Sequence, residues 1–503
     1  MSAPKKSYVP FLRQCFLTAS VAVNITGHGC VIGYSAILIP SLRNPDSHIK
    51  ATPSQESWIA SIIGFALIMG NVIVTPLMDL IGRKKCHIIS TIPVLAGWFL
   101  LLLADSVQAI ILARFLQGVS MGLLGPLGSI IISEMTDPKN RGAFLTCVSL
   151  SLTIGVMFTH TIGTILSWQQ TALLCSFLTF ISLNMIIFTT ETPSWLIAKG
   201  KYKESKEVFF YLRGEGPEQE DELEHMISAQ KMIRKSSVVG QKLSFCTKTG
   251  RFFRYLGNTF KKPEFYKPVA IMFHLYTLFQ FAGINVISSY AMDIIGQLVG
   301  PEANAALFMV LLDCQRLLCN VLAVFVMQKC NRRTVLFSMG FICVTAYLSK
   351  GTYALAKQND LLPSYLKNQY VPIFLIGMYM FSLTVGISSV PFAISGEIFP
   401  LEYRGLGGGI GTLPLSLNFF VAVKCFPVLT GAIGLPYTYY VYGSVVFYCL
   451  SVLWFILPET KDRTLQEIED ELRGKSMQGE RRESEPLNAK MLMRRYSSQI
   501  IIH

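Results

Sequence analysis

Charged residues are scarce in this sequence. They make up 15% of the 503 residues, while 51% of the residues are hydrophobic. An ordinary soluble protein carries about 25% charged residues. The scarcity excludes a soluble multidomain enzyme and a disordered chain, because both need a largely polar surface in water. The mean hydropathy of +0.45 instead indicates a protein that crosses a membrane many times.

Cysteine patterns and catalytic motifs are missing as well. The 12 cysteines include no CxxC pair and no metal-ligand spacing, and most of them lie inside apolar runs. A disulfide scaffold and a metal site are therefore not indicated. The chain also lacks a nucleotide-binding loop and a catalytic triad. We expect no cofactor, no enzymatic activity and no role as a primary pump.

Long apolar stretches are what the sequence has in abundance. A helix needs roughly 20 mostly apolar residues to cross a bilayer. Twelve stretches are long enough, and they lie at about residues 11–40, 57–80, 86–104, 107–133, 144–166, 168–189, 268–298, 304–328, 333–355, 370–395, 406–430 and 433–457. The sequence therefore predicts an all-α membrane protein with twelve transmembrane helices.

The positive charges predict how these helices are oriented. Lys and Arg gather in the connections after the second, fourth, eighth and tenth stretches, in the segment 190–267 and in the tail after residue 458. Such residues favour the cytoplasmic side. With an even number of spans, both termini are then expected in the cytoplasm. The net charge of +13 reflects this topology and attraction to the lipid bilayer, and we expect no nucleic-acid partner.

Charged motifs occur twice along the chain. Glu134 with Arg141 and Glu397 with Arg404 both stand in a Glu-x6-Arg-Gly pattern, each after the fourth span of its half. Duplicated bundles of this kind place the substrate between the halves and rock one half against the other. We expect two pseudo-symmetric six-helix bundles, with a first bundle at 1–189, a cytoplasmic linker with short helices at 190–267, a second bundle at 268–457 and a cytoplasmic tail at 458–503.

These motifs resemble the sugar porter branch of the major facilitator superfamily over roughly residues 20–470. The resemblance rests on Gly82-Arg83-Lys84, both Glu-x6-Arg-Gly loops, Gln280-x-x-Gly283-Ile284-Asn285 and Pro458-Glu459-Thr460-Lys461. Within that branch, Ser57-Trp58 and Glu191-Thr192-Pro193-Ser194-Trp195-Leu196 are similar to the insect facilitated trehalose transporter type.

The resemblance implies the major facilitator fold and a carrier in the plasma membrane. Such a carrier moves a hexose or trehalose by facilitated diffusion through alternating access. Two alternatives stay open. One is a sugar sensor on the same fold that does not transport, and the other is a carrier of a non-sugar organic solute.

Carboxylates and guanidinium groups at the cytoplasmic helix ends are expected to act as gates. Ion pairs there can hold helices together and must break during a transport cycle. The first expected cluster holds Asp79, Arg83, Arg114, Glu134 and Arg141, and the second holds Arg332, Arg333, Glu397 and Arg404. The alternative is that these are ordinary charges of cytoplasmic loops with no gating role.

A sugar is bound by amides, hydroxyls and aromatic faces and requires no charge. Gln280 and Asn285 in the seventh span resemble positions that bind sugar in the family, and hydrogen bonding between helices is the alternative. Asn418, Tyr290 and Phe392 complete the predicted site, with packing as an equal alternative for Tyr290.

Asp313 and Arg316 are unusual in an apolar span. We expect an ion pair between them, one helical turn apart, because pairing keeps an arginine in a membrane at the lowest cost. A contact between Arg316 and an anionic substrate and a misalignment are the alternatives. Ser35 stands where proton-coupled relatives carry an aspartate, so the resemblance implies facilitated diffusion. His160 is expected to be packed or hydrogen-bonded.

Overall fold

Twelve helices or helix pairs are long and apolar enough to cross a membrane in the part of the chain that the structure describes. The structure is a computed structural model and describes residues 8–238, 257–300, 304–399, 404–461, 463 and 465–473. The predicted fold class is therefore confirmed, and the observed spans match the twelve apolar stretches to within a few residues.

Each half of the chain contributes six consecutive spans. The first six are α1 (Val9–Gly33) with α2 (Ser35–Arg43), α3 (Pro53–Ile81), α4 (Arg83–Leu102), α5 (Val107–Met135), α6 (Pro138–Gly163) and α7 (Trp168–Ile187). The last six are α12 (Pro263–Phe281) with α13 (Ile284–Val299), α14 (Ala305–Lys329), α15 (Arg332–Gln358), α16 (Tyr370–Ser382) with the π-helical turn η2 (Leu383–Ile387) and α17 (Ser389–Glu397), α18 (Arg404–Ile433) and α19 (Leu435–Ile456).

Polar residues cap the starts of two spans, α3 and α7. Thr52 accepts a hydrogen bond from the backbone of Gln55, whose side chain bonds back to Thr52, and α3 starts at Pro53. Ser167 and Gln170 form the same capping box at the start of α7. These caps satisfy backbone N–H groups that a helix start leaves without partners.

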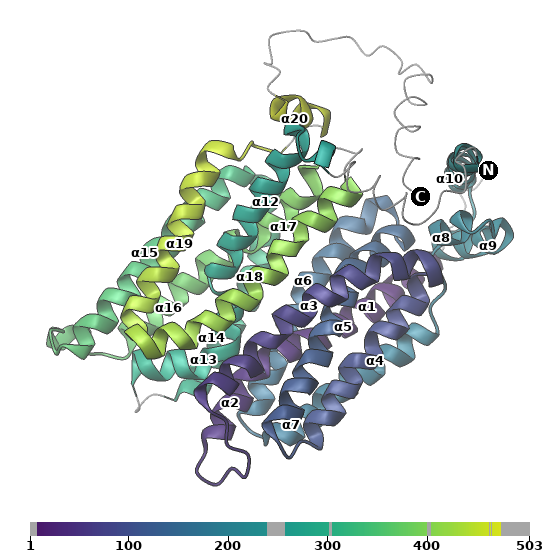
Figure 1. The fold of residues 1–503 in the computed structure, drawn as a ribbon. Coiled ribbons are helices and arrows are strands. Elements are labelled where there is room, and N and C mark those ends of the chain that lie inside the picture. Colours follow the sequence, from purple (N-terminus) through teal and green to yellow (C-terminus); the bar gives the residue numbers. More distant parts are fainter. Residues whose placement is uncertain are drawn as a thin grey trace.

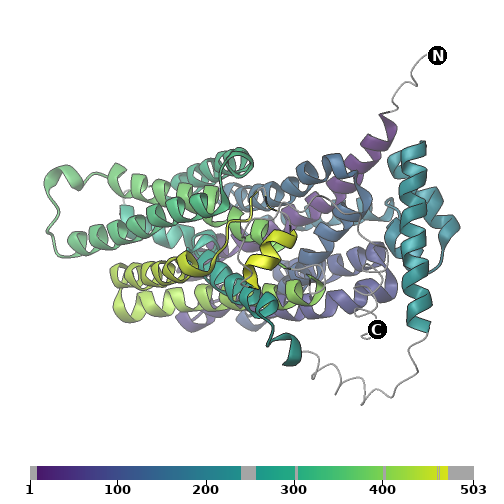
Figure 2. The ribbon, with the colours of Figure 1, turned by 90° about the horizontal axis from the view of Figure 1, so that it is seen from above.

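The helices form two bundles that lie side by side (Figures 1 and 2). The first bundle contains α1 to α7, in purple to blue, and the second contains α12 to α19, in teal to yellow. The bundles meet where α3 packs on α18, α2 on α13 and α6 on α14. These packed helix pairs form the described interface between the two bundles.

Glycine allows close helix packing inside the first bundle. A Cβ atom on Gly29 of α1 would collide with the backbone of α6 at Leu152 and Gly155, and one on Gly155 would collide with α1 at Thr26. Small residues let membrane helices approach until their backbones touch. The α1–α6 contact therefore depends on these two glycines.

The two ends of the bundles differ in charge and in what covers them. One end carries the Lys- and Arg-rich connections, and we call it the basic end. There α8 (Pro193–Ala198), α9 (Tyr202–Arg213) and α10 (Pro217–Val238) lie beside the first bundle, and α20 (Leu465–Leu472) lies on the second. The other end, which we call the opposite end, carries the loop after α2 and the short helix η1 (Ser364–Leu366) (Figure 1).

Candidate functional site

The seventh span is broken at Gly283, between α12 and α13. Gly283 has a φ of 89°, a left-handed conformation that glycine adopts without strain. The break leaves the carbonyl of Ala282 without a helical partner, and the hydroxyls of Tyr347 and Tyr379 both donate to it. The ammonium group of Lys350 lies 3.4 Å from the ring centre of Tyr379. Polar groups of the second bundle therefore satisfy the carbonyl that the break leaves without a helical partner.

The two predicted amides lie on either side of the break. Asn285 Nδ2 donates to Gln280 Oε1 at 2.7 Å, and Gln280 Nε2 donates to the carbonyl of Leu415 on α18 at 3.1 Å. Both side chains are buried. Each amide still has hydrogen-bonding capacity left, because the described residues offer no partner to Asn285 Oδ1 or to the second N–H of Gln280. The pair can stabilise the helix contact and also bind a solute.

The other three predicted site residues lie on the second bundle too. Asn418 Nδ2 donates to Thr277 Oγ1 at 3.0 Å and to the carbonyl of Pro414 at 2.9 Å. Tyr290 is buried, and its hydroxyl donates to the carbonyl of Val423 at 3.3 Å. Phe392 is 51% exposed and thus presents an aromatic face. The exposed ring of Phe392 also packs against Phe279 and Tyr276, whereas the ring of Tyr290 is buried and stacks on Phe426.

At the basic end of the first bundle, three of the residues expected to form a gate lie within ion-pair distance of one another. Arg83 lies 3.0 Å from Glu134 and 3.8 Å from Asp79. Arg141 forms no ion pair with the residues that the structure describes, and its buried Nε has no hydrogen-bond partner there. The structure thus brings Asp79, Arg83 and Glu134 together and leaves Arg141 apart.

Arg114 lies elsewhere and does not belong to this cluster. It is fully buried in the first bundle, where its guanidinium donates to Ser35 Oγ at 2.7 Å, to Gln117 Oε1 at 2.9 Å and to the carbonyl of Ile59 at 3.3 Å. Arg114 and Glu134 are both on α5, about 30 Å apart along the helix at 1.5 Å per residue. The expectation that Arg114 helps to form the gate is therefore corrected.

The second bundle contains the matching cluster. Arg332 Nη2 lies 3.3 Å from Glu397 Oε1, and Thr460 Oγ1 donates to the other oxygen of Glu397 at 2.6 Å. Arg333 donates to the carbonyls of Leu457 and Trp454 and does not contact Glu397. The side chain of Arg404 lies outside the described residues.

Two glutamates that the sequence did not assign to the gates cap helices at this end. Glu191 accepts hydrogen bonds from the backbone N–H groups of Arg83 and Lys84, at the start of α4. Glu459 does the same for Arg332 and Arg333, at the start of α15. A carboxylate at a helix N-terminus is stabilising. The repeated Glu-Thr motif after the last span of each half was the sequence feature from which these caps could have been predicted.

The pKa of Glu459 reflects this position. Burial acts to raise the pKa of its carboxyl group, but four backbone N–H donors outweigh burial and hold the pKa below its usual value. The donors are those of Lys461, Arg333, Arg332 and Thr460. Glu459 is therefore ionised at neutral pH and ties the tail segment to the start of α15.

At the opposite end, an ion pair joins the two bundles. Arg43 of α2 lies 2.8 Å from Asp293 of α13, and it also binds Glu56 of α3 at 2.6 Å. Nearby, the ammonium group of Lys424 lies 4.1 Å from the ring centre of Trp58 on α3. These contacts join the two bundles at the opposite end. This ion pair could not be predicted from local spacing, because its two residues are 250 positions apart.

A second contact between the bundles lies inside the membrane and corrects an expectation. Asp313 does not form the expected ion pair with Arg316. Its carboxylate contacts His160 Nδ1 on α6 at 2.5 Å. Arg316 instead donates to Ser288 Oγ at 2.8 Å, and its buried Nε has no partner among the described residues.

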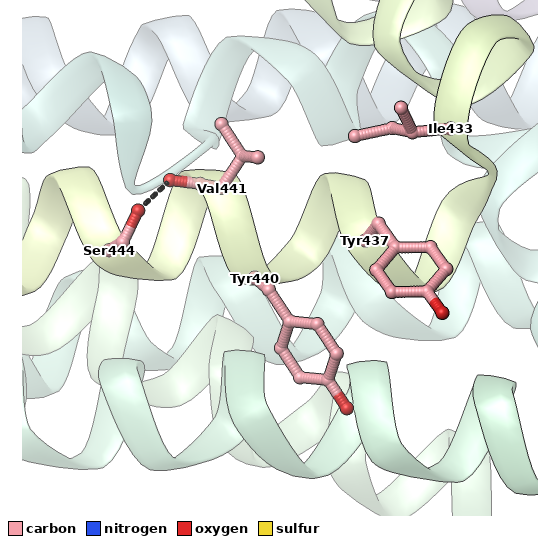
Figure 3. Close-up of a pocket in the computed structure, with 5 residues that line it drawn as sticks. All are labelled: Ile433, Tyr437, Tyr440, Val441 and Ser444. Carbon is pink, nitrogen blue, oxygen red and sulfur yellow. Dashed lines mark hydrogen bonds between the residues drawn. The ribbon is translucent and has the colours of Figure 1, made fainter.

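A hollow of about 700 Å³ lies on the second bundle (Figure 3). It is lined by Ile433, Tyr437, Tyr440, Val441 and Ser444, which come from the end of α18 and from α19. No residue of the first bundle lines it. It is therefore not a candidate for a solute path between the bundles.

Comparison with known proteins identifies the family to which this chain belongs and solved structures that share its fold. The model of the family described as sugar (and other) transporter matches residues 15–472. The facilitated trehalose transporter Tret1 of Apis mellifera ligustica is 27% identical over 93% of this chain and 90% of its own length. Tret1 of Bombyx mori is 24% identical over 91% of this chain and 86% of its own length.

Solved structures show the same fold. The inward open conformation of the xylose transporter XylE from E. coli superposes with a TM-score of 0.70, at 17% identity over 91% of this chain and 99% of that one. The crystal structure of a D-xylose-proton symporter gives 0.66, at 16% identity over 91% of this chain and 100% of that one. At these identities the likeness shows the fold alone.

Proposed function

Because this chain belongs to the sugar transporter family, we propose that it is a membrane carrier that moves a sugar by facilitated diffusion through alternating access. The observation that carries the proposal is the break at Gly283 with Gln280 and Asn285 beside it. An interrupted span that presents amides near the middle of a bundle is how transporters of this architecture bind their solutes.

We place the basic end in the cytoplasm and the opposite end outside the cell. The support is the distribution of Lys and Arg among the connections. Both termini are then cytoplasmic, and we propose the plasma membrane as the location. From here on, the opposite end is called the outer side.

The positions of the ion pairs support alternating access. On the outer side, Arg43 and Asp293 form an ion pair across the bundles. On the cytoplasmic side, the ion pairs of Arg83 with Glu134 and of Arg332 with Glu397 each lie within one bundle. The structure therefore has its outer side closed. Outward opening requires the cross-bundle contacts to break.

For the solute we propose a hexose or trehalose. The relatives at 27% and 24% identity are named facilitated trehalose transporters, and the amides with the exposed face of Phe392 suit an uncharged sugar. A non-sugar organic solute with a carboxylate is a second candidate, because Arg316 Nε is buried without a partner among the described residues.

Diffusion without proton coupling is supported by the surroundings of Arg114. Proton-coupled relatives carry an aspartate at the position of Ser35, and here Arg114 donates instead to the hydroxyl of Ser35 at 2.7 Å. A hydroxyl does not change its charge during a transport cycle.

Uptake of radiolabelled solutes tests the proposal. Proteoliposomes that hold the full chain should equilibrate glucose or trehalose and not accumulate it, with no effect of a protonophore. Organic acids tested in parallel distinguish the second candidate. Accumulation that collapses with the protonophore would refute facilitated diffusion. Specific binding of a sugar without any uptake would replace the carrier with a sensor.

A further inference from the structure

A histidine of one bundle is held between two oxygen atoms of the other bundle. His160 Nδ1 lies 2.5 Å from Asp313 Oδ2 of α14, and His160 Nε2 lies 3.2 Å from the carbonyl oxygen of Ser288 on α13. The side chains of His160 and Asp313 are only 1% and 7% exposed. Water therefore has little access to this contact, and the protein must supply its hydrogen-bond partners.

The two contacts need one proton more than an uncharged imidazole provides. A carbonyl oxygen and an ionised carboxylate accept hydrogen bonds and donate none. Either both ring nitrogens of His160 carry hydrogen, or one ring nitrogen and the Asp313 carboxyl do. In both arrangements the pair holds an extra proton, compared with a neutral histidine beside an ionised aspartate.

The neighbouring charges favour the first arrangement. Arg316 lies one helical turn from Asp313 on α14, and a cation close to a carboxyl group favours its ionised form. The other titratable groups near the contact are Tyr379 of α16, which faces Arg316, and Cys30 of α1 and Cys175 of α7, which lie beside Thr159. None of these three is a charged group at neutral pH. We therefore place the proton on His160.

We propose that His160 and Asp313 form a proton-binding site whose occupancy is linked to closure of the outer side. The proposal rests on the alternating access described above. When α6 separates from α13 and α14 on the outer side, the imidazole loses both oxygens and meets water. A histidine in water is mostly neutral above about pH 6.5. The site thus binds a proton on closing and releases it on opening.

The position of His160 separates this role from proton-coupled transport. His160 is near the outer end of α6, which ends at Gly163. The proton enters and leaves on the outer side, so it is not carried across the membrane with the solute. The expected effect is control of the carrier by external acid, while the solute still moves only down its own gradient.

Thermodynamic linkage between proton binding and closure gives the direction and the size of the pH effect on the carrier. The proton is bound in the closed state, so acid favours closure and the effect is lost as the pH rises. One linked proton changes the ratio of closed to open carriers by at most about tenfold for each pH unit.

A distance measurement that requires no solute tests the site. Fluorophores introduced through unnatural amino acids at Asp105 and Leu361, both exposed on the outer side, report the separation of the bundles by single-molecule energy transfer in nanodiscs. As the pH is lowered from 7.5 to 5.5, the wild type should shift toward the short distance between the two fluorophores. His160→Gln should remove this pH dependence, and Asp313→Asn provides the same test if the first variant fails to fold.

Thr153→Ala is the matched control. Thr153 Oγ1 and Asn320 form a neutral contact of 2.7 Å on the same two helices, closer to the cytoplasmic side. This variant should keep the pH dependence of the wild type. A wild type with no pH response, or a His160→Gln variant with the full response, would overturn the proposal. Because no solute is added, such a result leaves the sugar uptake test unaffected.

Discussion

Replacing Asp293 by asparagine should loosen the closed outer side. Arg43 holds Asp293 of the second bundle at 2.8 Å and Glu56 of the first bundle at 2.6 Å. Asp293→Asn removes the ion pair across the bundles and leaves the Arg43–Glu56 contact in place. The variant therefore isolates what one cross-bundle charge contributes to closure.

The structure indicates how large the effect should be. The Arg43 side chain is 45% exposed and that of Asp293 is 24% exposed, so water screens their attraction. Ion pairs of this kind stabilise by about 0.2–1 kcal/mol. At the upper value, the ratio of closed to open carriers falls about fivefold. The contact of Lys424 with Trp58 is unaffected, so the variant should still close part of the time.

The same fluorophore positions at Asp105 and Leu361 measure this shift. Asp293→Asn should increase the long-distance population at neutral pH, and raising the salt concentration should move the wild type in the same direction, because salt screens exposed charges. Glu56→Gln is the matched control, since it removes a carboxylate from the same arginine within one bundle. It should not open the outer side.

Two results would refute this reasoning. One is a distance distribution of Asp293→Asn equal to that of the wild type, which would mean that the ion pair contributes nothing to closure. The other is an equal opening in Glu56→Gln, which would mean that the loss of negative charge near Arg43 matters and not the link between the bundles.

Three further predictions concern the amides and the cytoplasmic side. Gln280→Ala should raise the half-saturation concentration for uptake about five- to thirtyfold, as expected for a lost buried hydrogen bond of 1–2 kcal/mol; an unchanged value would assign Gln280 to helix packing. Glu397→Gln should slow uptake at unchanged surface expression, because it weakens the contacts with Arg332 and Thr460; wild-type rates would exclude a gate there. The lowered pKa of Glu459 contributes stability above the usual glutamate pKa of 4.5, and this contribution is lost as the pH falls through the lowered value. Thermal unfolding between pH 3 and 7 should therefore depend less on pH in Glu459→Gln, and identical profiles would contradict this.

The sequence alone determined the membrane-spanning fold. A bilayer imposes a minimum length on every apolar helix, so hydropathy located all twelve spans. The repeated motifs also placed Arg83 near Glu134 and Arg332 near Glu397, because charged residues at the ends of spans must stay at the interface. The prediction for Arg114 was wrong, although its distance from Glu134 could have been worked out from the rise of one helix.

Only the tertiary structure decided which charged residues pair. Asp313 has Arg316 one turn away on its own helix, yet it contacts His160, which is 153 positions away in the sequence. Arg43 likewise contacts Asp293 on the other bundle. Hydropathy and local spacing describe each helix by itself. The partner of a buried charge depends on which helices touch and how they are rotated, and that is set by packing between the bundles.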